Sequence, residues 1–202
     1  MIETVISDLG NVLLKFDNSI YFRAMTRYTG RSVAEIRAVT HDNLDLLTLF
    51  EKGLVSPFDF YKNAKDLLEI TAGYEEFYAA YCDVFVLVPA VLDLYRLLKT
   101  KRRMILLSNT DVVRWTFIKS KFPEILFFDD YVLSFDVGAM KPQPEIFLEA
   151  IRAGGAKPDR MVFIDDMPEN VAGAERMGMK GIVFAEGMDL AAELRSLDEE
   201  LF

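Results

Sequence analysis

Carboxylate side chains lie at the ends of apolar, strand-like segments of this 202-residue chain. Asp8 ends the first such segment, and Asp165 and Asp166 end the fourth. Carboxylates that are crowded together raise one another's pKa, and a divalent cation relieves their repulsion. If folding brings these ends together, the chemistry they favour is binding of a hard cation through oxygen ligands.

Small polar residues and one lysine occupy equivalent positions on other segments. Ser108 and Asn109 end the second segment, and Lys141 follows Gly138 between the third segment and the next helix. In an open parallel sheet, ligands bind beyond the carboxyl ends of the strands, near the reversal in strand order. These residues are therefore candidates for one site on the same edge as the carboxylates.

The elements that would position this site alternate between strands and helices. Three of the strand-like segments, among them 161–165, are near-continuous apolar runs, typical of parallel strands buried on both faces. Amphipathic helices are predicted at 91–99, 144–153 and 170–177, the last two ending at glycines. Alternation of this kind predicts an α/β fold with an open, doubly wound parallel sheet. The five predicted strands are 5–8, 104–108, 131–135, 161–165 and 181–185.

One long interval interrupts the alternation. Residues 17–88 contain no convincing buried strand, and glycines at 30, 53 and 73 separate helix-like stretches. The interval is too long for a loop in a compact domain. We therefore predict a core domain of residues 1–16 and 89–202, with residues 17–88 forming a helical cap called here the helical insertion. Its predicted helices are 19–28, 32–38, 44–50, 57–68 and 74–84.

Composition limits the possible partners and location. A formal net charge of −9 argues against nucleic acid or an anionic membrane as the main partner. An anion-binding site in such a chain needs local positive charge from a metal ion, a lysine or backbone N–H groups. No apolar run approaches the roughly 20 residues that span a bilayer. A strand-like N-terminus without a signal pattern and a single cysteine, Cys82, predict a cytoplasmic protein.

The candidate residues also match, in order, the four motifs of the haloacid dehalogenase-like hydrolase superfamily. Asp-Leu-Gly-Asn-Val at 8–12 resembles the first motif, and Leu-Ser-Asn at 107–109 resembles the second. Lys-Pro at 141–142 resembles the third, and Phe-Ile-Asp-Asp-Met-Pro-Glu-Asn at 163–170 resembles the fourth. The helical insertion occupies the position of the family's cap. The resemblance therefore extends over essentially the whole chain.

This resemblance implies a Mg²⁺-dependent phosphatase that acts on a small phosphomonoester. Asp8 would be the nucleophile that forms an aspartyl phosphate, and Lys141 would neutralise charge during the transfer. Ser108 and the backbone N–H of Asn109, together with Lys141, would bind the phosphoryl oxygens. The implied metal ligands are Asp8, the carbonyl of Gly10, Asp166, and Asp165 directly or through water.

The first motif departs from the common pattern of the family at Gly10. Phosphatases of the superfamily usually carry a second Asp there, which acts as general acid and base. The Asp-Leu-Gly-Asn-Val form resembles a bacterial subgroup that includes sugar phosphatases such as α-glucose-1-phosphate phosphatase. A sugar phosphate is therefore the preferred substrate class, whereas the proton donor remains unassigned.

Two other functions compete with the phosphatase. Haloacid dehalogenases also lack the second Asp, but they need no metal and do not retain the acidic pair found at 165–166. A non-catalytic phosphate-binding module similar to a receiver domain is the third possibility. In receiver domains, however, the acidic pair follows the first strand.

Structural explanations compete with the catalytic ones for several residues. Asp165 and Asp166 could simply cap the following helix, and Ser108 could belong to an ordinary turn. Asp17 is a candidate replacement acid, although capping the first helix of the insertion is the simpler interpretation. His41 is expected in a solvated loop. The sequence makes no prediction of oligomeric state.

Overall fold

Five parallel strands form the central sheet of the computed structural model, which describes residues 1–201. The strands lie in the order β5-β4-β1-β6-β7, and every neighbouring pair is parallel. The predicted α/β fold with a parallel sheet is therefore confirmed, with strand bounds shifted by one or two residues at most. The strands are β1 (Thr4–Ser7), β4 (Arg103–Ser108), β5 (Asp130–Leu133), β6 (Met161–Asp165) and β7 (Lys180–Val183).

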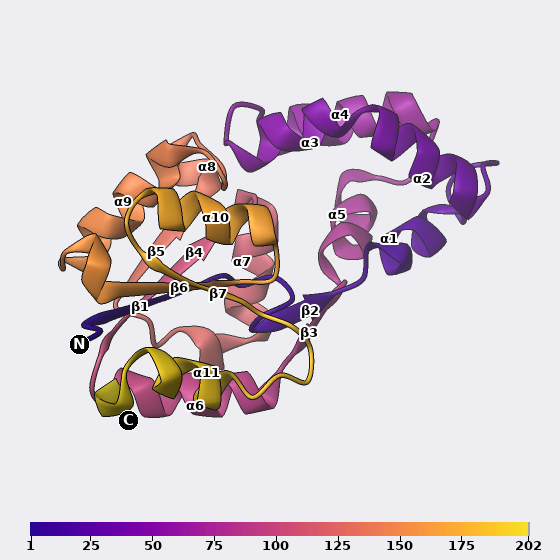
Figure 1. The fold of residues 1–202 in the computed structure, drawn as a ribbon. Helices are drawn as coiled ribbons and strands as arrows, with labels where there is room; N and C mark the ends of the chain where they lie inside the picture. The colour runs from indigo at the N-terminus through magenta and orange to yellow at the C-terminus, as the bar shows by residue number, and fades with distance from the viewer. Residues whose placement is uncertain (202) are drawn as a thin grey trace.

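Helices cover both faces of this sheet, as its apolar strands require. Successive residues of β1 point to opposite faces, so that Val5 joins one apolar cluster and Ile6 joins the other. The Ile6 face packs against α9 (Pro144–Gly154) and α10 (Pro168–Arg176). Helices α6 (Pro89–Lys99), α7 (Val112–Lys121) and α11 (Leu190–Leu197) supply buried residues to the cluster on the Val5 face. Figure 1 shows the sheet between these two layers.

Short elements complete the layer around the sheet. They are α8 (Ser134–Val137), which directly follows β5, and the 3₁₀ turns η1 (Pro123–Ile125), η2 (Pro158–Arg160) and η3 (Glu199–Leu201). Neither α7 nor α11 was predicted from the sequence, although both bury apolar residues against the sheet.

The helical insertion contains five helices packed around aromatic side chains. The rings of Phe50 and Phe60 stack with centroids 4.2 Å apart, and Phe77 is fully buried beside them. Stacked and edge-on ring pairs of this kind stabilise a core beyond their buried area. The helices are α1 (Asn18–Met25), α2 (Val33–Asp42), α3 (Leu44–Glu51), α4 (Pro57–Leu68) and α5 (Tyr74–Cys82).

A two-stranded antiparallel ribbon joins the insertion to the sheet layer. It consists of β2 (Leu14–Phe16) and β3 (Phe85–Leu87), which were not predicted. Each strand has three residues, too few to show a period, and its partner lies about seventy residues away along the chain. A contact of this range leaves no local signal in the sequence.

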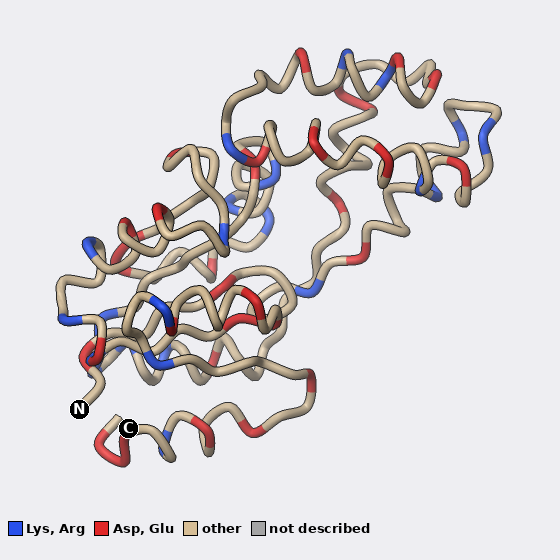
Figure 2. The backbone as a smooth tube through the Cα atoms, turned by 45° about the horizontal axis from the view of Figure 1, so that its top comes forward, with Lys and Arg blue, Asp and Glu red and all other residues tan. Residues whose placement is uncertain are grey.

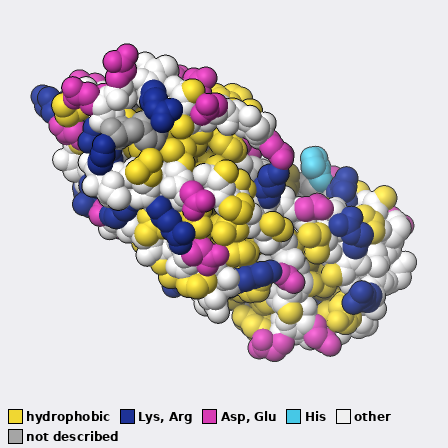
Figure 3. Space-filling view, turned by 90° about the horizontal axis from the view of Figure 1, so that it is seen from below, with side chains coloured by type: hydrophobic (Ala, Val, Ile, Leu, Met, Phe, Trp, Pro, Cys, Tyr) yellow, Lys and Arg dark blue, Asp and Glu magenta, His cyan; other side chains and the backbone are white. Residues whose placement is uncertain are grey.

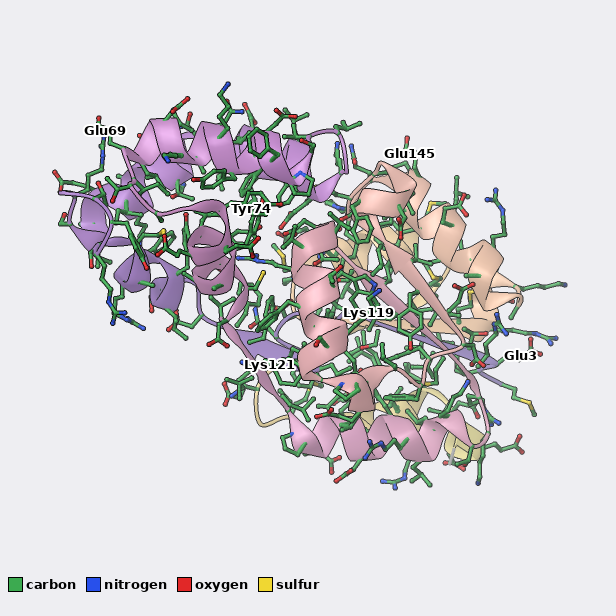
Figure 4. The ribbon with its side chains drawn as sticks, turned by 180° about the vertical axis from the view of Figure 1, so that it is seen from behind. Glu3, Glu69, Tyr74, Lys119, Lys121 and Glu145 are labelled. Carbon is green, nitrogen blue, oxygen red and sulfur yellow. The ribbon has the colours of Figure 1, made fainter. Side chains whose placement is uncertain are left out.

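The insertion also contacts the sheet layer directly. Helix α5 packs against α7, and the Tyr81 hydroxyl donates a hydrogen bond of 2.8 Å to the Asp111 carboxylate. Figure 4 shows α7, marked by the labels of Lys119 and Lys121, between the insertion and the sheet. Two separate connections, the ribbon and this helix contact, therefore hold the insertion beside the carboxyl ends of the strands.

Charged residues are spread over the whole chain. Acidic and basic positions are scattered along the backbone in both parts of the molecule in Figure 2, and both kinds are interspersed with hydrophobic side chains on the face in Figure 3. None of the helices within residues 1–201 has both the length and the apolar character needed to cross a membrane.

Candidate active site

The site begins where the strand order reverses. The chain passes from β1 to β4 on one side of the sheet and later returns to β6 on the other side. Ser7 pairs with Leu106 of β4 and with Ile164 of β6, so Asp8 follows level with the ends of both neighbours. Crevices at such reversals are the usual binding sites of open α/β sheets.

Lys141 joins the carboxylates of two strands. Its Nζ lies 2.6 Å from Oδ1 of Asp8 and 2.7 Å from Oδ2 of Asp165. It also donates to the carbonyl of Leu107 at 3.1 Å, so all three of its N–H bonds have acceptors. The lysine side chain is 1% exposed. A buried ammonium with this many partners has a fixed position, which a charged group needs if it is to act without reorganisation.

The Asn109 side chain fixes the backbone of Lys141. Its Oδ1 accepts from the Lys141 N–H at 2.8 Å, and its Nδ2 donates to the Lys141 carbonyl at 3.0 Å. Two bonds to one residue align the loop after α8 with the end of β4. Ser108, which precedes it, is buried and has only a weak contact of 3.5 Å to the Asn109 carbonyl. The hydroxyl of Ser108 is therefore available to a ligand.

The two aspartates after β6 have different surroundings. The Asp165 carboxylate is fully buried and accepts from Lys141, from the Met167 N–H at 2.8 Å and from Nδ2 of Asn170 at 3.0 Å. Asp166 is partly exposed, and one bond of 2.9 Å from Nδ2 of Asn11 reaches its Oδ2. Asp166 thus retains free oxygen lone pairs, whereas those of Asp165 are largely used by the protein.

Capping does not explain this acidic pair. The following helix α10 begins at Pro168, and Met167, not an aspartate, is its N-cap residue. The bonds of Asp165 instead tie the turn between β6 and α10 to Lys141. The capping interpretation of the pair is therefore wrong in its simple form.

The three aspartates form a group that suits a divalent cation. One oxygen from each of Asp8, Asp165 and Asp166 lies within 4.8 Å of the others. Burial, opposed by Lys141 and reinforced by Asp165, raises the pKa of Asp8 to about 6. Three carboxylates against one lysine leave net negative charge in a buried place. An oxygen-only donor set with excess negative charge fits Mg²⁺.

Lys141 remains positive in this arrangement. Burial alone would lower its pKa, but Asp8 and Asp165 outweigh burial and raise the pKa above its ordinary value. The ammonium therefore persists over the physiological pH range. It supplies the local positive charge that a chain of net charge −9 needs for binding an anion.

A cavity of about 300 Å³ opens onto these groups. All of the predicted site residues except Asp165 line it, and Asp165 lies directly behind Lys141. The insertion and α7 contribute further polar side chains that were not predicted. The site residues lining the cavity are Asp8, Gly10, Ser108, Asn109, Lys141 and Asp166, and the additional polar ones are Asn18, Glu51 and Arg114.

Two of the additional residues are ionisable, Arg114 being buried and Glu51 partly buried. Arg114 of α7 donates to Oδ1 of Asn18 at 3.0 Å and lies 4.0 Å above the Tyr81 ring, while its Nε has no acceptor. Glu51 is the last residue of α3. A carboxylate at a helix C-terminus opposes the helix dipole, and this mismatch is the one sequence signal that could have identified Glu51.

Gly10 has room for only a small addition. A Cβ atom built there would lie 3.2 Å from the Phe16 ring and 4.0 Å from Oδ2 of Asp8. Its φ is not in the left-handed region, so a side chain needs only a small displacement of the ring. Asn11, the next residue, has a φ of 53° and turns its side chain toward Asp166.

The remaining candidates lie outside this cavity. Asp17 is the N-cap of α1, accepting from the Ser19 N–H at 2.8 Å, and its bonds to Ser19 lower its pKa. The capping interpretation of Asp17 therefore holds. His41 has a side chain that is 79% exposed and lies in the last turn of α2, not in the predicted loop. Cys82 is buried, as expected of a small apolar residue.

Comparisons with known proteins identify the family of this chain. A family model described as haloacid dehalogenase-like hydrolase matches residues 2–178. The chain is similar to a D-ribitol-5-phosphate phosphatase of Bacteroides thetaiotaomicron, with 27% identity over 96% of this chain and 97% of the relative.

Two solved structures extend the likeness to the fold. A HAD family enzyme of Bacteroides thetaiotaomicron in a magnesium complex superposes with a TM-score of 0.84 and 25% identity, covering 96% of this chain and 98% of the other. A HAD-like family hydrolase of Porphyromonas gingivalis gives a TM-score of 0.82 and 29% identity, covering 99% and 100%.

Proposed function

The chain belongs to the haloacid dehalogenase-like hydrolase family, and on that premise we propose that it is a Mg²⁺-dependent phosphatase with Asp8 as its nucleophile. The observation that carries the proposal is the ion network of Asp8, Lys141 and Asp165 beside Asp166 at the mouth of the cavity. A nucleophile, a fixed cation and a metal-binding carboxylate are the parts that phosphoryl transfer requires.

In the proposed reaction, Asp8 attacks the phosphorus atom while the bond from phosphorus to the ester oxygen breaks. Water then hydrolyses the aspartyl phosphate and releases inorganic phosphate. The Ser108 hydroxyl and the Asn109 N–H bind phosphoryl oxygens, and Lys141 offsets the charge that develops on them.

Mg²⁺ would be held by Asp8, the Gly10 carbonyl and Asp166, with Asp165 as a direct or water-mediated ligand. When bound, the ion offsets the negative charge of the carboxylates and the phosphoryl group, so that both can occupy one site. The hydrogen bonds that already engage Asp165 favour Asp166 as the direct ligand.

A sugar or sugar-alcohol phosphate is the proposed substrate class. The similarity to a D-ribitol-5-phosphate phosphatase over nearly the full length of both chains supports this class. Asn18, Glu51 and Arg114 add polar groups on the side of the cavity away from the carboxyl ends of the strands, which suits a hydroxyl-bearing leaving group.

The proposal includes the remaining expectations from the sequence. The division into a core of residues 1–16 and 89–202 and an insertion of residues 17–88 is part of it. So are a cytoplasmic location and the absence of nucleic acid and membrane partners. The buried, unpaired Cys82 agrees with a reducing compartment, and cell fractionation tests the location.

A screen of phosphomonoesters tests the activity. The panel contains D-ribitol 5-phosphate, α-glucose 1-phosphate, glyceraldehyde 3-phosphate and 4-nitrophenyl phosphate, each assayed with Mg²⁺ and with EDTA. We expect phosphate release that requires Mg²⁺. Chloride release from a 2-haloacid in EDTA would instead identify a dehalogenase, and silence in both assays would favour the binding module.

A further inference from the structure

The proposed phosphatase lacks an acid at the position where one is expected. When the bond from phosphorus to an alkyl oxygen breaks, the departing oxygen needs a proton, and a positioned acid typically contributes 10²–10⁴-fold. Gly10 supplies no side chain for this step. Asp17, the nearest alternative along the chain, is exposed and bonded to Ser19, with a lowered pKa.

Glu51 enters the cavity from the side opposite the carboxyl ends of the strands. It lines the same 300 Å³ space as Asp8, Ser108 and Lys141. The Ser134 hydroxyl donates a hydrogen bond of 2.6 Å to the Glu51 carbonyl and thereby fixes this end of α3 against the sheet layer. The carboxyl group is thus brought to the active site by packing between the insertion and the core.

The approach of the insertion at this point is unusually close. Gly53, two residues after Glu51, has a φ of 69°, and a Cβ atom there would lie 2.3 Å from the Phe135 carbonyl. Only glycine satisfies both conditions. The chain therefore meets the sheet layer tightly just beyond the glutamate, and this contact fixes the backbone that carries the carboxyl group.

No hydrogen bond or ion pair engages the Glu51 carboxyl group within residues 1–201. Three other glutamates of the insertion are occupied: Glu35 and Glu76 complete capping boxes, and Glu69 pairs with Arg31, while Glu75 is exposed to solvent. A partly buried carboxyl group without a bonded partner in the protein adds no hydrogen bond to the fold and is free to exchange a proton with a ligand in the cavity.

Charges around Glu51 suit proton transfer near neutral pH. Burial raises its pKa to about 7, with Arg114 and Lys141 lowering it and Asp111 raising it. Its place at the C-terminus of α3 acts in the same direction as burial. A substantial fraction of the group is protonated at neutral pH, and that fraction falls as the pH rises through 7.

We propose that Glu51 is the general acid that protonates the leaving-group oxygen, supplied by the helical insertion in place of the carboxyl group that Gly10 lacks. This assignment rests on the proposed phosphatase activity and adds a catalytic residue to it.

Glu51 donates a proton in the first half-reaction and recovers one in the second. As Asp8 bonds to phosphorus, the ester bond breaks, and its oxygen takes the proton of Glu51 to leave as an alcohol. The resulting Glu51 carboxylate then takes a proton from the water that attacks the aspartyl phosphate. Phosphate departs, and both Asp8 and Glu51 return to their starting states.

The test is the dependence of kcat/KM on the leaving group in Glu51→Gln. The variant and the wild type are assayed with Mg²⁺ on a series from 4-nitrophenyl phosphate through phenyl phosphate to an alkyl phosphate. We expect a loss of about 10²–10⁴-fold for the alkyl ester and less than about tenfold for the 4-nitrophenyl ester. Glu75→Gln, an exposed glutamate of the same insertion, is the matched control.

Two further measurements separate an acid from a binding or structural residue. In the wild type, kcat/KM for the alkyl ester should fall above pH about 7, and this decline should be absent in Glu51→Gln. Adding Gly10→Asp to Glu51→Gln should restore alkyl ester turnover, because the new carboxyl group lies beside Asp8.

Each result supports or overturns the assignment. An equal loss for all esters, carried by a raised KM, would make Glu51 a substrate-binding residue and overturn it. The assignment would also be overturned if kcat/KM depended on the leaving group equally in Glu51→Gln and in the wild type. If Glu51→Gln fails to fold, the wild-type pH profiles on the two esters decide: parallel profiles overturn the proposal. A wild type without phosphatase activity would instead refute the proposed function itself.

Discussion

The two sides of the cavity are built differently. At the carboxyl ends of the strands, Lys141 has three acceptors and Asp165 has three donors. On the opposite side, the carboxyl group of Glu51 has no hydrogen bond or ion pair within residues 1–201, and Nε of Arg114 has no acceptor. A fully bonded side suits the phosphoryl group, which is the same in every substrate. Unpaired polar groups suit the part of the substrate that varies.

The largest expected effect tests the bonded side. Asp8→Asn keeps the shape of the side chain but removes the nucleophilic oxygen and its charge, so we expect kcat to fall by at least about 10⁴-fold. Rapid-quench detection of a phosphoenzyme should be positive in the wild type and negative in the variant. A variant that keeps wild-type turnover would exclude covalent catalysis at this residue.

The next effect concerns stability on the same side. Lys141→Met removes the cation between Asp8 and Asp165 and leaves two buried carboxylates uncompensated. We expect the free energy of unfolding to fall by about 3–5 kcal/mol, as for other broken buried ion pairs. Urea denaturation without Mg²⁺ measures this change. A loss below about 1 kcal/mol would mean that the network is not a preorganised unit.

On the opposite side of the cavity, removing a charged group should raise the free energy of unfolding instead of lowering it. Because burial raises the Glu51 pKa from 4.5 to about 7, its contribution to stability is complete below 4.5 and is lost as the pH rises through 7. At about 1.4 kcal/mol per pKa unit, Glu51→Gln should stabilise the protein at pH 8 by up to roughly 3 kcal/mol, less any solvent screening.

The comparison is made from Tm values of variant and wild type at pH 4 and pH 8. The stabilising effect should be present only at pH 8, and Glu75→Gln should show no such difference. A destabilised Glu51→Gln at pH 8 would show that the unpaired carboxylate serves the fold after all.

The smallest expected effect is the loss of stability when neutral hydrogen bonds are removed at the carboxyl ends of the strands. Asn170→Ala removes the side-chain bonds to Asp165 but leaves the Lys141 and Met167 bonds in place. We expect a loss of about 1–2 kcal/mol in the free energy of unfolding. Measured beside Lys141→Met, it separates the contribution of a neutral bond from that of the ion pair.

The same contrast decides what could be predicted from the sequence. Asp8, Ser108 and Asp165 each lie at the carboxyl end of a recognisable strand, and parallel strands bring these ends together whatever the rest of the chain does. Glu51 reaches the cavity only because α3 packs against α8, a contact between residues 83 positions apart. Arg114 lies in a helix that was not predicted, since its apolar pattern is weak. Local patterns therefore identified the bonded side and missed the other.

The hydroxyl of Ser134 can exchange one hydrogen-bond acceptor for another. It accepts from the Thr110 N–H at 2.9 Å, and its single proton can point to the Glu51 carbonyl at 2.6 Å or to the Thr110 carbonyl at 2.9 Å. If the end of α3 moved away from α8, the Ser134 proton could rotate to the Thr110 carbonyl, and the Glu51 carbonyl would meet water. Loss of this hydrogen bond would therefore leave no buried polar atom without a partner. Separation of α3 from α8 is opposed by packing, such as the close approach of Gly53 to Phe135, and not by this hydrogen bond.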